Sequence, residues 1–401
     1  MPTSPPLPES NRSERPDALI IGGGVIGLAI AWRLAQRGLT VTVIDRAPGR
    51  GASWAAAGML APVTEVHYEE EALLGLNLES ARRWADFAAG LEEASGTSVG
   101  YRPCGTLAVA ADAGDHAWLG DLHRFQGELG LKAERLTSRE CRRMEPALSP
   151  RIRGGVLVEG DHQVDPRRLA AALIEAARRG GVEFRAGTVD SLLMETGTCA
   201  GVVIGSGNGS GSGTEALTAG VVVLAAGAWS STLTGADDLP LGLLPPIRPV
   251  KGQILRLRQR SGVPVINRNV RGLVEGSSVY LVPRSDGEVV VGATMEEQGF
   301  DTTVTAGAVM NLLRDAYGLV PELSEFEFLE ATASLRPCSP DNAPVIGATG
   351  VNGLVMAGGH HRNGILLTPV TADLMAELIT TGSMPALGKP FDPARFGAMA
   401  R

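Results

Sequence analysis

Gly22-Gly23-Gly24-Val25-Ile26-Gly27 lies between an apolar run, 18–21, and an amphipathic run, 25–37. A G-x-G-x-x-G spacing between a strand and a helix is typical of the turn that binds the diphosphate of a dinucleotide. The first glycine allows the tight turn, the second lets backbone N–H groups approach the phosphates, and the third lets the helix pack closely on the strand. The helix start then presents unpaired donors to negative charge. The stretch therefore predicts an α/β fold with a diphosphate site.

Asp45 lies where a ribose-binding residue is expected. It follows a second apolar run, 41–44, and comes 18 residues after Gly27. An acidic side chain there accepts hydrogen bonds from ribose hydroxyls and disfavours a 2′-phosphate. We therefore expect an adenine dinucleotide other than NADP. A glycine-rich connector in another kind of α/β protein is the alternative.

The composition is that of an ordinary globular protein. With 401 residues, 44% of them hydrophobic, the chain can form two or three domains. The net charge of -8 and the lack of a basic run argue against a nucleic-acid partner. Residues 1–16 are rich in proline, serine and charge, which predicts a disordered tail.

No membrane segment or metal site is expected. The longest apolar stretch, 18–32, contains four glycines and is the strand–turn–helix unit itself, so we expect a cytoplasmic protein. The cysteines lack the spacing of a zinc site or a disulfide framework. They are Cys104, Cys141, Cys199 and Cys338.

The small residues of 51–59 have two interpretations: a backbone lying close to a large ligand, or a tightly packed helix. Further along, Asp165 and Pro166 predict the start of a helix that ends near Arg179. The Gly/Ser run 205–213 predicts a flexible hairpin loop. Other patterns predict helices at about 70–94 and 368–380, two short helices within 112–150, strands at about 101–110, 182–185, 221–224 and 354–357, and an antiparallel sheet over 252–293.

These patterns divide the chain into two interleaved domains. The nucleotide-binding domain is expected to consist of residues 17–98, 158–247 and 341–396. The second domain, of antiparallel strands, is expected to consist of residues 99–157 and 248–340.

The chain contains an ordered set of motifs: GGGVIG (22–27), ASWAAAGML (52–60), VDP (164–166), AAGAW (225–229), VKGQ (250–253), YLVPR (280–284), VGATM (291–295), LRPCSPD (335–341) and GHHRNGILLTP (359–369). This set resembles the D-amino-acid oxidase family of flavoproteins over about residues 17–378, and within it the glycine oxidases of thiamine biosynthesis. The resemblance implies a Rossmann-like FAD-binding domain of the glutathione-reductase type and an antiparallel-sheet substrate domain.

The resemblance also implies FAD as the cofactor, with its adenosine end at the glycine turn and its ring between the domains. Cys338 does not match the cysteine that holds flavin covalently in the sarcosine-oxidase branch, so noncovalent FAD is expected. The cofactor-binding residues implied are Gly22, Gly24, Val25, Ile26, Gly27, Asp45, Arg46, Ser53, Ala56, Ala57, Gly58, Met59, Val189, Ala226, Gly227, Trp229, Arg336, His361, Arg362, Asn363, Gly364, Ile365 and Leu366.

Three residues match the family's catalytic positions. Arg336 matches the carboxylate clamp, because a planar guanidinium binds a carboxylate through two parallel hydrogen bonds. Tyr280 matches the hydroxyl partner of this clamp, and Arg362 matches a second arginine beside flavin and substrate. For either arginine, a surface ion pair is the alternative.

Met59, Met295 and His361 match positions of the substrate pocket. Met295 has simple core filling as an alternative. Because His360 and His361 are adjacent, we expect at most one of them to face the site, and a structural histidine is the favoured interpretation. His361 occupies a position that is often aromatic in close relatives, which leaves the shape of the pocket open there.

The activity implied is hydride transfer from the Cα of glycine to flavin N5, followed by reoxidation by O2 with release of H2O2. The imine then hydrolyses to glyoxylate and ammonia or supplies thiazole synthesis, with thiazole synthase as a candidate consumer. Relatives are often homotetramers. The alternatives are an oxidase or dehydrogenase of sarcosine or small D-amino acids, perhaps with a quinone acceptor, and a non-catalytic flavin-binding subunit.

Overall fold

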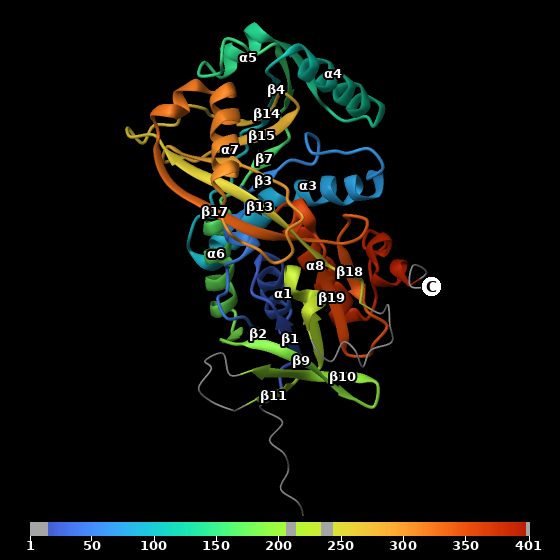
Figure 1. Cartoon of the computed structure of the whole chain (residues 1–401). Coiled ribbons are helices and arrows are strands. Elements are labelled where there is room, and N and C mark those ends of the chain that lie inside the picture. Colours follow the sequence, from blue (N-terminus) through green and yellow to red (C-terminus); the bar gives the residue numbers. More distant parts are fainter. Residues whose placement is uncertain (1–14, 206–213, 234–243, 398–401) are drawn as a thin grey trace, which may run out of the picture.

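The computed structural model describes residues 15–205, 214–233 and 244–397 (Figure 1). Most of the expected tail, 1–16, and most of the expected loop, 205–213, lie outside these ranges. Among the described residues, no helix has both the length and the apolar composition needed to cross a membrane.

A six-stranded sheet carries the glycine turn. Its order is β18-β19-β12-β1-β2-β8, and every neighbouring pair is parallel except β18 and β19. Ala18 in β1 lies opposite Val41 on one side and Val221 on the other. The strands are β1 (Ala18–Ile21), β2 (Val41–Ile44), β8 (Glu183–Arg185), β12 (Val221–Leu224), β18 (Val345–Ala348) and β19 (Leu354–Gly358). The strand predicted at each of these places except β18 is confirmed.

Both faces of this sheet are covered, as the continuous apolar runs of its strands require. Alternate residues of β1 enter two separate cores, one with Ile20 and one with Leu19. Four helices pack together on the first face: α1 (Val25–Gln36), α3 (Glu71–Ser95), α6 (Pro166–Arg179) and α8 (Thr368–Thr381). A three-stranded antiparallel sheet covers the second: β9 (Thr188–Glu195), β10 (Thr198–Gly205) and β11 (Glu215–Thr218).

Local sequence explains where these helices begin. The Asp165 side chain accepts hydrogen bonds from the amides of Arg167 and Arg168, with Pro166 in the first turn of α6, as predicted. Gly27 in α1 is necessary because a Cβ there would lie 2.0 Å from the carbonyl oxygen of Gly22.

An eight-stranded sheet forms the second domain, in the upper half of Figure 1. Its order is β17-β13-β16-β15-β14-β4-β6-β5, and it is antiparallel except between β14 and β4. The expected antiparallel sheet is therefore confirmed with one parallel pair. The strands are β4 (Thr106–Ala110), β5 (Glu134–Thr137), β6 (Gly154–Val158), β13 (Arg248–Arg258), β14 (Asn269–Val274), β15 (Ser277–Pro283), β16 (Glu288–Gly292) and β17 (Glu327–Cys338).

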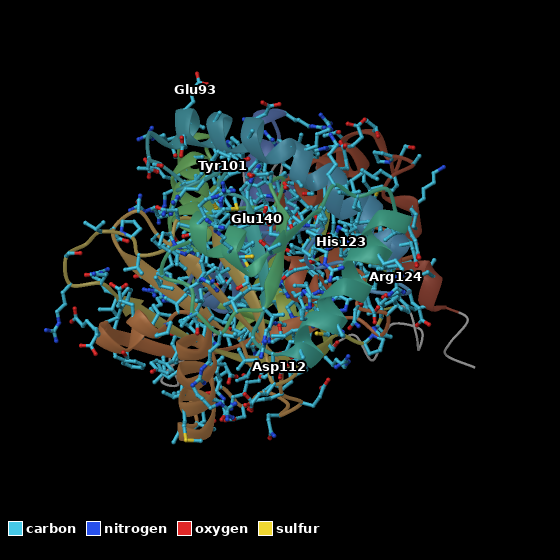
Figure 2. All side chains as sticks on the ribbon, turned by 90° about the horizontal axis from the view of Figure 1, so that it is seen from above. Glu93, Tyr101, Asp112, His123, Arg124 and Glu140 are labelled. Carbon is cyan, nitrogen blue, oxygen red and sulfur yellow. The ribbon has the colours of Figure 1, made fainter. Side chains whose placement is uncertain are left out.

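The helices of this domain differ from the expected pair within 112–150. There α4 (Ala113–Glu128) is a long helix and α5 (Ser138–Met144) a short one, with strand β5 between them. In the view from above, Asp112 lies at the start of α4, His123 and Arg124 lie within α4, and Glu140 lies on α5 (Figure 2). Helix α7 (Ala306–Leu319) packs on β13, β14, β15 and β16. The strand expected at 101–110 begins only at Thr106, because Gly105 has a φ of 72°.

Short elements join the domains. The run 51–59 forms a single helical turn, α2 (Ala52–Ala55), and then an irregular segment that leads into β3 (Met59–Leu60), so the helix interpretation holds only for 52–55. Strand β3 pairs with β7 (His162–Gln163). The 3-10 helices are η1 (Gly227–Thr232), η3 (Pro321–Glu325), η4 (His361–Asn363), η5 (Lys389–Phe391) and η6 (Pro393–Phe396).

Candidate active site

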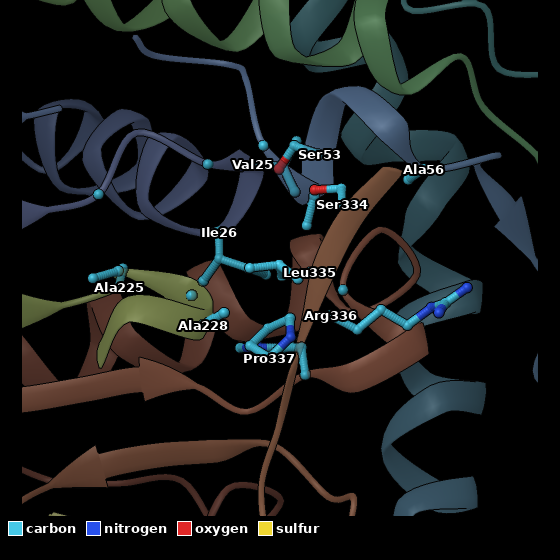
Figure 3. Close-up of a pocket in the computed structure, with 18 of the residues that line it drawn as sticks. Val25, Ile26, Ser53, Ala56, Ala225, Ala228, Ser334, Leu335, Arg336 and Pro337 are labelled. Carbon is cyan, nitrogen blue, oxygen red and sulfur yellow. Dashed lines mark hydrogen bonds between the residues drawn. The ribbon is translucent and has the colours of Figure 1, made fainter. Parts of the chain in front are cut away.

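A cavity of about 430 Å³ extends from the glycine turn to the eight-stranded sheet. Its volume lies within the range of small-molecule sites. Figure 3 shows Val25, Ile26 and Ser53 on one side of it and Leu335, Arg336 and Pro337 on another. Segments from both domains therefore meet around one space.

Most residues expected at the site line this cavity. They are Gly22, Gly24, Val25, Ile26, Asp45, Arg46, Ser53, Ala56, Ala57, Gly58, Met59, Val189, Ala226, Gly227, Trp229, Tyr280, Arg336, His361, Arg362, Gly364 and Ile365. Four expected residues do not: Gly27, Met295, Asn363 and Leu366.

The positions of these four have simple physical reasons. Gly27 packs against Gly22, and the carbonyl of Leu366 accepts hydrogen bonds from Ser80 and Trp84 in the core. Asn363 is buried in η4. Met295 was expected in the substrate pocket, but it is 68% exposed, while its neighbours Thr294 and Glu296 still hydrogen-bond to β13.

The glycine turn is shaped for an anion. Gly22 has a φ of 106°, and a Cβ there would lie 2.4 Å from the carbonyl oxygen of Ala225. At the start of α1, the amide of Val25 donates to Ser53 Oγ at 3.0 Å. The next amides of the first turn have no acceptor within the helix. A Cβ on Gly24 would meet only Ser53 Oγ, at 3.3 Å, so glycine leaves room for a diphosphate beside these donors.

Asp45 is held rigidly beside the turn. One carboxylate oxygen accepts from the amide of Gly23 and the other from the amide of Ala47, each at 2.6 Å. A carboxylate has about four acceptor positions, so Asp45 can also bind ribose hydroxyls. The residues present therefore fit the adenosine and diphosphate parts of FAD.

Arg336 supplies an unpaired positive charge. Its Nη1 donates to the carbonyl oxygens of Lys251, at 3.4 Å, and Thr294, at 3.0 Å. In the described part of the chain, no carboxylate lies within ion-pair distance of Arg336. The remaining N–H groups can bind an anion, and a carboxylate matches the guanidinium fork best.

Arg362 is already paired. Its guanidinium donates to the carboxylate of Glu70, the residue that precedes α3, and both side chains are largely buried. Its Nη1 also lies 3.4 Å from His361 Nδ1. Arg362 therefore brings a neutralised charge to the site. No sequence pattern indicates Glu70 as the partner of Arg362, because the two residues lie 292 positions apart.

Both neighbouring histidines line the cavity, whereas at most one was expected there. His361 has a positive φ, 47°. His360 Nε2 lies 3.0 Å from Thr371 Oγ1, which satisfies it within the core. Burial lowers the pKa of each histidine to about 3, with a contribution from Arg362 at His361. Both are therefore neutral near pH 7.

Tyr280 presents its hydroxyl to the same space. Among the described residues, this hydroxyl has no hydrogen-bond partner, and burial raises the pKa of Tyr280, so it remains protonated. Glu65 also lines the cavity, although no sequence motif indicates it. It forms an ion pair with Arg271, which lies opposite Tyr280 in the sheet.

The loop that carries Met59 is fastened to the second domain. Arg284, fully buried, donates to the carbonyl of Ala57 at 2.5 Å and to Gln163 Oε1 at 2.6 Å. Desolvation lowers the pKa of Arg284 to about 10, which leaves it charged near pH 7. This contact holds the segment just before Met59, which pairs with Gln163 in the β3–β7 sheet.

Comparison with known proteins adds to this geometry. Residues 17–378 match the family model described as FAD dependent oxidoreductase. The chain is 34% identical over 379 residues to the glycine oxidase of Geobacillus kaustophilus, covering 92% of this chain and 93% of that one. The crystal structure of glycine oxidase from Geobacillus kaustophilus superimposes with a TM-score of 0.84, at 33% identity and with 96% of this chain and 99% of that one covered.

A longer relative matches as well. The chain is 36% identical over 386 residues to the bifunctional protein ThiO/ThiG of Trichormus variabilis. That match covers 96% of this chain and 56% of the relative. The chain thus spans about half the length of the bifunctional relatives that it matches.

Proposed function

Because the chain belongs to the family of FAD-dependent oxidoreductases, we propose that it is a glycine oxidase. The reaction converts glycine, O2 and water to glyoxylate, ammonia and H2O2. The observation that carries the proposal is Arg336, an unpaired guanidinium in the cavity that also contains the glycine turn. The names of similar proteins support glycine as the substrate.

FAD, when bound, accepts the hydride that leaves the substrate Cα. Gly22, Gly24 and the start of α1 would hold its diphosphate, and Asp45 its ribose. We propose that FAD is held without a covalent bond. Burial raises the pKa of the Cys338 thiol to about 11, so the nucleophilic thiolate is scarce near pH 7.

Arg336 and Tyr280 would bind and orient the substrate. The free N–H groups of Arg336 bind the carboxylate, and the Tyr280 hydroxyl donates a further hydrogen bond. Held in this way, the substrate turns Cα toward the middle of the cavity. Met59 and His361 line the space around it and would limit the side chain that fits. Met295, at 68% exposure, is left out of this proposal.

Anaerobic addition of glycine to the purified holoenzyme tests the function. We expect the flavin absorbance near 450 nm to bleach, and H2O2 to form when air is admitted. The Arg336→Ala variant should retain FAD but require far more glycine. If a large excess of glycine leaves the parent spectrum unchanged, the proposal is wrong.

Sarcosine and small D-amino acids are the alternative substrates. They carry the same carboxylate for Arg336 but place a methyl group on N or Cα. A comparison of glycine, sarcosine, D-alanine and D-proline, each with peroxide and dye-reduction readouts, ranks the substrates and identifies the electron acceptor.

The proposal extends to partners and assembly. The name of the bifunctional relative supports a link to thiamine biosynthesis, with thiazole synthase as the consumer of the imine. We also propose a cytoplasmic homo-oligomer, for which a tetramer is the expected state. Light scattering of the purified holoenzyme tests its size, and stimulation of thiazole formation by the purified chain tests the link.

A further inference from the structure

Two glycines lie directly beneath the side chains proposed to bind the substrate. A methyl group on Gly252 would lie 2.2 Å from Nη1 of Arg336 and 2.5 Å from its Cζ. A methyl group on Gly292 would lie 2.3 Å from the hydroxyl oxygen of Tyr280 and 2.4 Å from its Cζ. The guanidinium and the phenol ring therefore occupy the space that a side chain at these two positions would fill.

A positive φ does not explain either glycine. Gly252 lies in β13 and Gly292 at the end of β16, and neither has a positive φ. Gly22, by contrast, has a φ of 106° that most residues rarely adopt. Glycine weakens a strand, so its presence at 252 and 292 indicates that space is required above it.

The register of the sheet places both glycines on the same face of the sheet. Gly252 pairs with Ser334, two residues before Arg336, and Gly292 pairs with Tyr280 on one side and Ile254 on the other. Gly252 and Ile254 lie on the same face of β13, because alternate residues of a strand share a face. Gly292, opposite Ile254, therefore lies on the same face of the sheet as Gly252. Gly252, Ile254, Tyr280 and Arg336 all line the cavity.

We propose that Gly252 and Gly292 are positioning residues, which set Arg336 and Tyr280 low enough to leave room for a substrate carboxylate. The proposal rests on the proposed function. A methyl group at Gly252 would push the guanidinium away from the sheet by roughly 1 Å, off the carbonyls of Lys251 and Thr294. The displaced guanidinium would then occupy the space of the carboxylate that it binds.

The test uses Gly252→Ala in the holoenzyme, with acetate as a carboxylate probe and glycine as substrate. We expect the Kd of acetate, measured from the flavin absorbance, and the KM of glycine to rise about tenfold or more. The kcat should fall less than kcat/KM, because the methyl group acts on binding. Gly292→Ala should act in the same direction through Tyr280.

Gly272→Ala is the matched control. Gly272 lies in β14 of the same sheet, and a methyl group there would lie 2.3 Å from Leu319 Cδ1, outside the cavity lining. It introduces a comparable clash in the core. We expect it to lower the thermal midpoint but to leave the acetate Kd within about twofold of the parent value.

A double-mutant cycle separates positioning from general damage. In an Arg336→Ala background, Gly252→Ala should change the acetate Kd by less than about twofold, since the guanidinium is gone. If Gly252→Ala alone does not retain FAD, the double variant should recover it. A parent-like Gly252→Ala variant, an effect that persists without Arg336, or a double variant that fails to recover FAD would overturn the proposal.

The same measurements distinguish this proposal from the proposed function. If added glycine does not reduce the parent enzyme but Gly252→Ala still weakens acetate binding through Arg336, the proposed glycine oxidation is wrong. The positioning role of Gly252 is then still supported. If added glycine reduces the parent enzyme and Gly252→Ala with equal KM, and both bind acetate with equal Kd, the positioning role is wrong and the proposed function is still supported.

Discussion

The guanidinium of Arg362 donates a hydrogen bond to the carboxylate of Glu70, which precedes α3. This contact neutralises Arg362, one of the two arginines expected at the substrate site, both of which line the cavity. Glu65 and Arg271 neutralise each other in the same region. Arg336 is thus left with the uncompensated charge, which suits a ligand with a single carboxylate.

Glu70→Gln should release Arg362 as a second anion-binding group. We expect malonate, with two carboxylates, to bind more tightly relative to acetate, by about threefold or more, because a second free guanidinium is present. Unfolding should become easier by about 1–2 kcal/mol, since a partly buried ion pair is broken. Flavin absorbance titrations and thermal unfolding measure the two effects.

Glu71→Gln is the control for this prediction. Glu71 is exposed in the first turn of α3. A malonate-to-acetate ratio that changes equally in both variants would contradict the assignment to Arg362.

Arg336→Lys should retain positive charge but lose the planar fork. We expect kcat/KM for glycine to fall about 10- to 100-fold, mainly through KM, because an ammonium cannot make the two parallel hydrogen bonds. Steady-state peroxide formation measures this. Equal kinetic constants in parent and variant would show that the fork is not used.

Asp45→Asn should weaken FAD binding without unfolding the protein. The amide group of Asn would place N–H donors against the amide of Gly23 or Ala47, where the carboxylate now accepts at 2.6 Å. We expect the FAD Kd to rise about tenfold, since acceptors for the ribose are lost as well. Fluorescence of released FAD measures the Kd, and far-UV circular dichroism checks the fold.

His360 should make stability depend on pH. Its pKa is about 3 in the folded protein, below the ordinary value of 6.5, because it is buried against Thr371. Between these values the unfolded chain binds a proton that the folded chain does not, so stability falls as the pH falls from 6.5 toward 3. Replacing His360 with Gln removes this contribution.

The measurement is the difference in unfolding free energy between parent and His360→Gln, from pH 7 to pH 4 with excess FAD. We expect the parent's advantage to shrink as the pH falls. Asp161, whose pKa is raised to about 7 by burial, acts in the opposite direction but is present in both proteins. A difference that does not change with pH would contradict the assignment.

The secondary structure was predictable from the sequence where residues close together in the chain determine it. Gly22 requires a positive φ, and Asp165 caps α6 through contacts within three residues. The strands of the six-stranded sheet follow from their apolar runs, because both faces are buried. Strand β5 was missed, since only Leu136 of its four residues is buried.

The chemistry of the cavity was only partly predictable. Arg336 and Tyr280 follow from motifs, whereas the pairing of Glu65 with Arg271 depends on folding alone and leaves no pattern in the sequence. Met295 is exposed and does not line the cavity, and the motif around it carries no information about side-chain exposure. Gly252 could have been recognised from the sequence, because a glycine inside an alternating strand often marks a place where other atoms approach the backbone closely.

The central sheet has a consequence for how the protein is made. Ala18 in β1 needs Val221 in β12 as its partner, and Val222 in turn lies opposite Leu354 in β19. A ribosome must therefore complete most of the chain before the glycine turn gains a finished sheet beneath it. Until then β1 has only β2 as a sheet partner, which leaves the β12 side of β1 unpaired, exposes the nascent chain to aggregation and favours slow folding. We therefore expect cofactor capture to come late in biosynthesis.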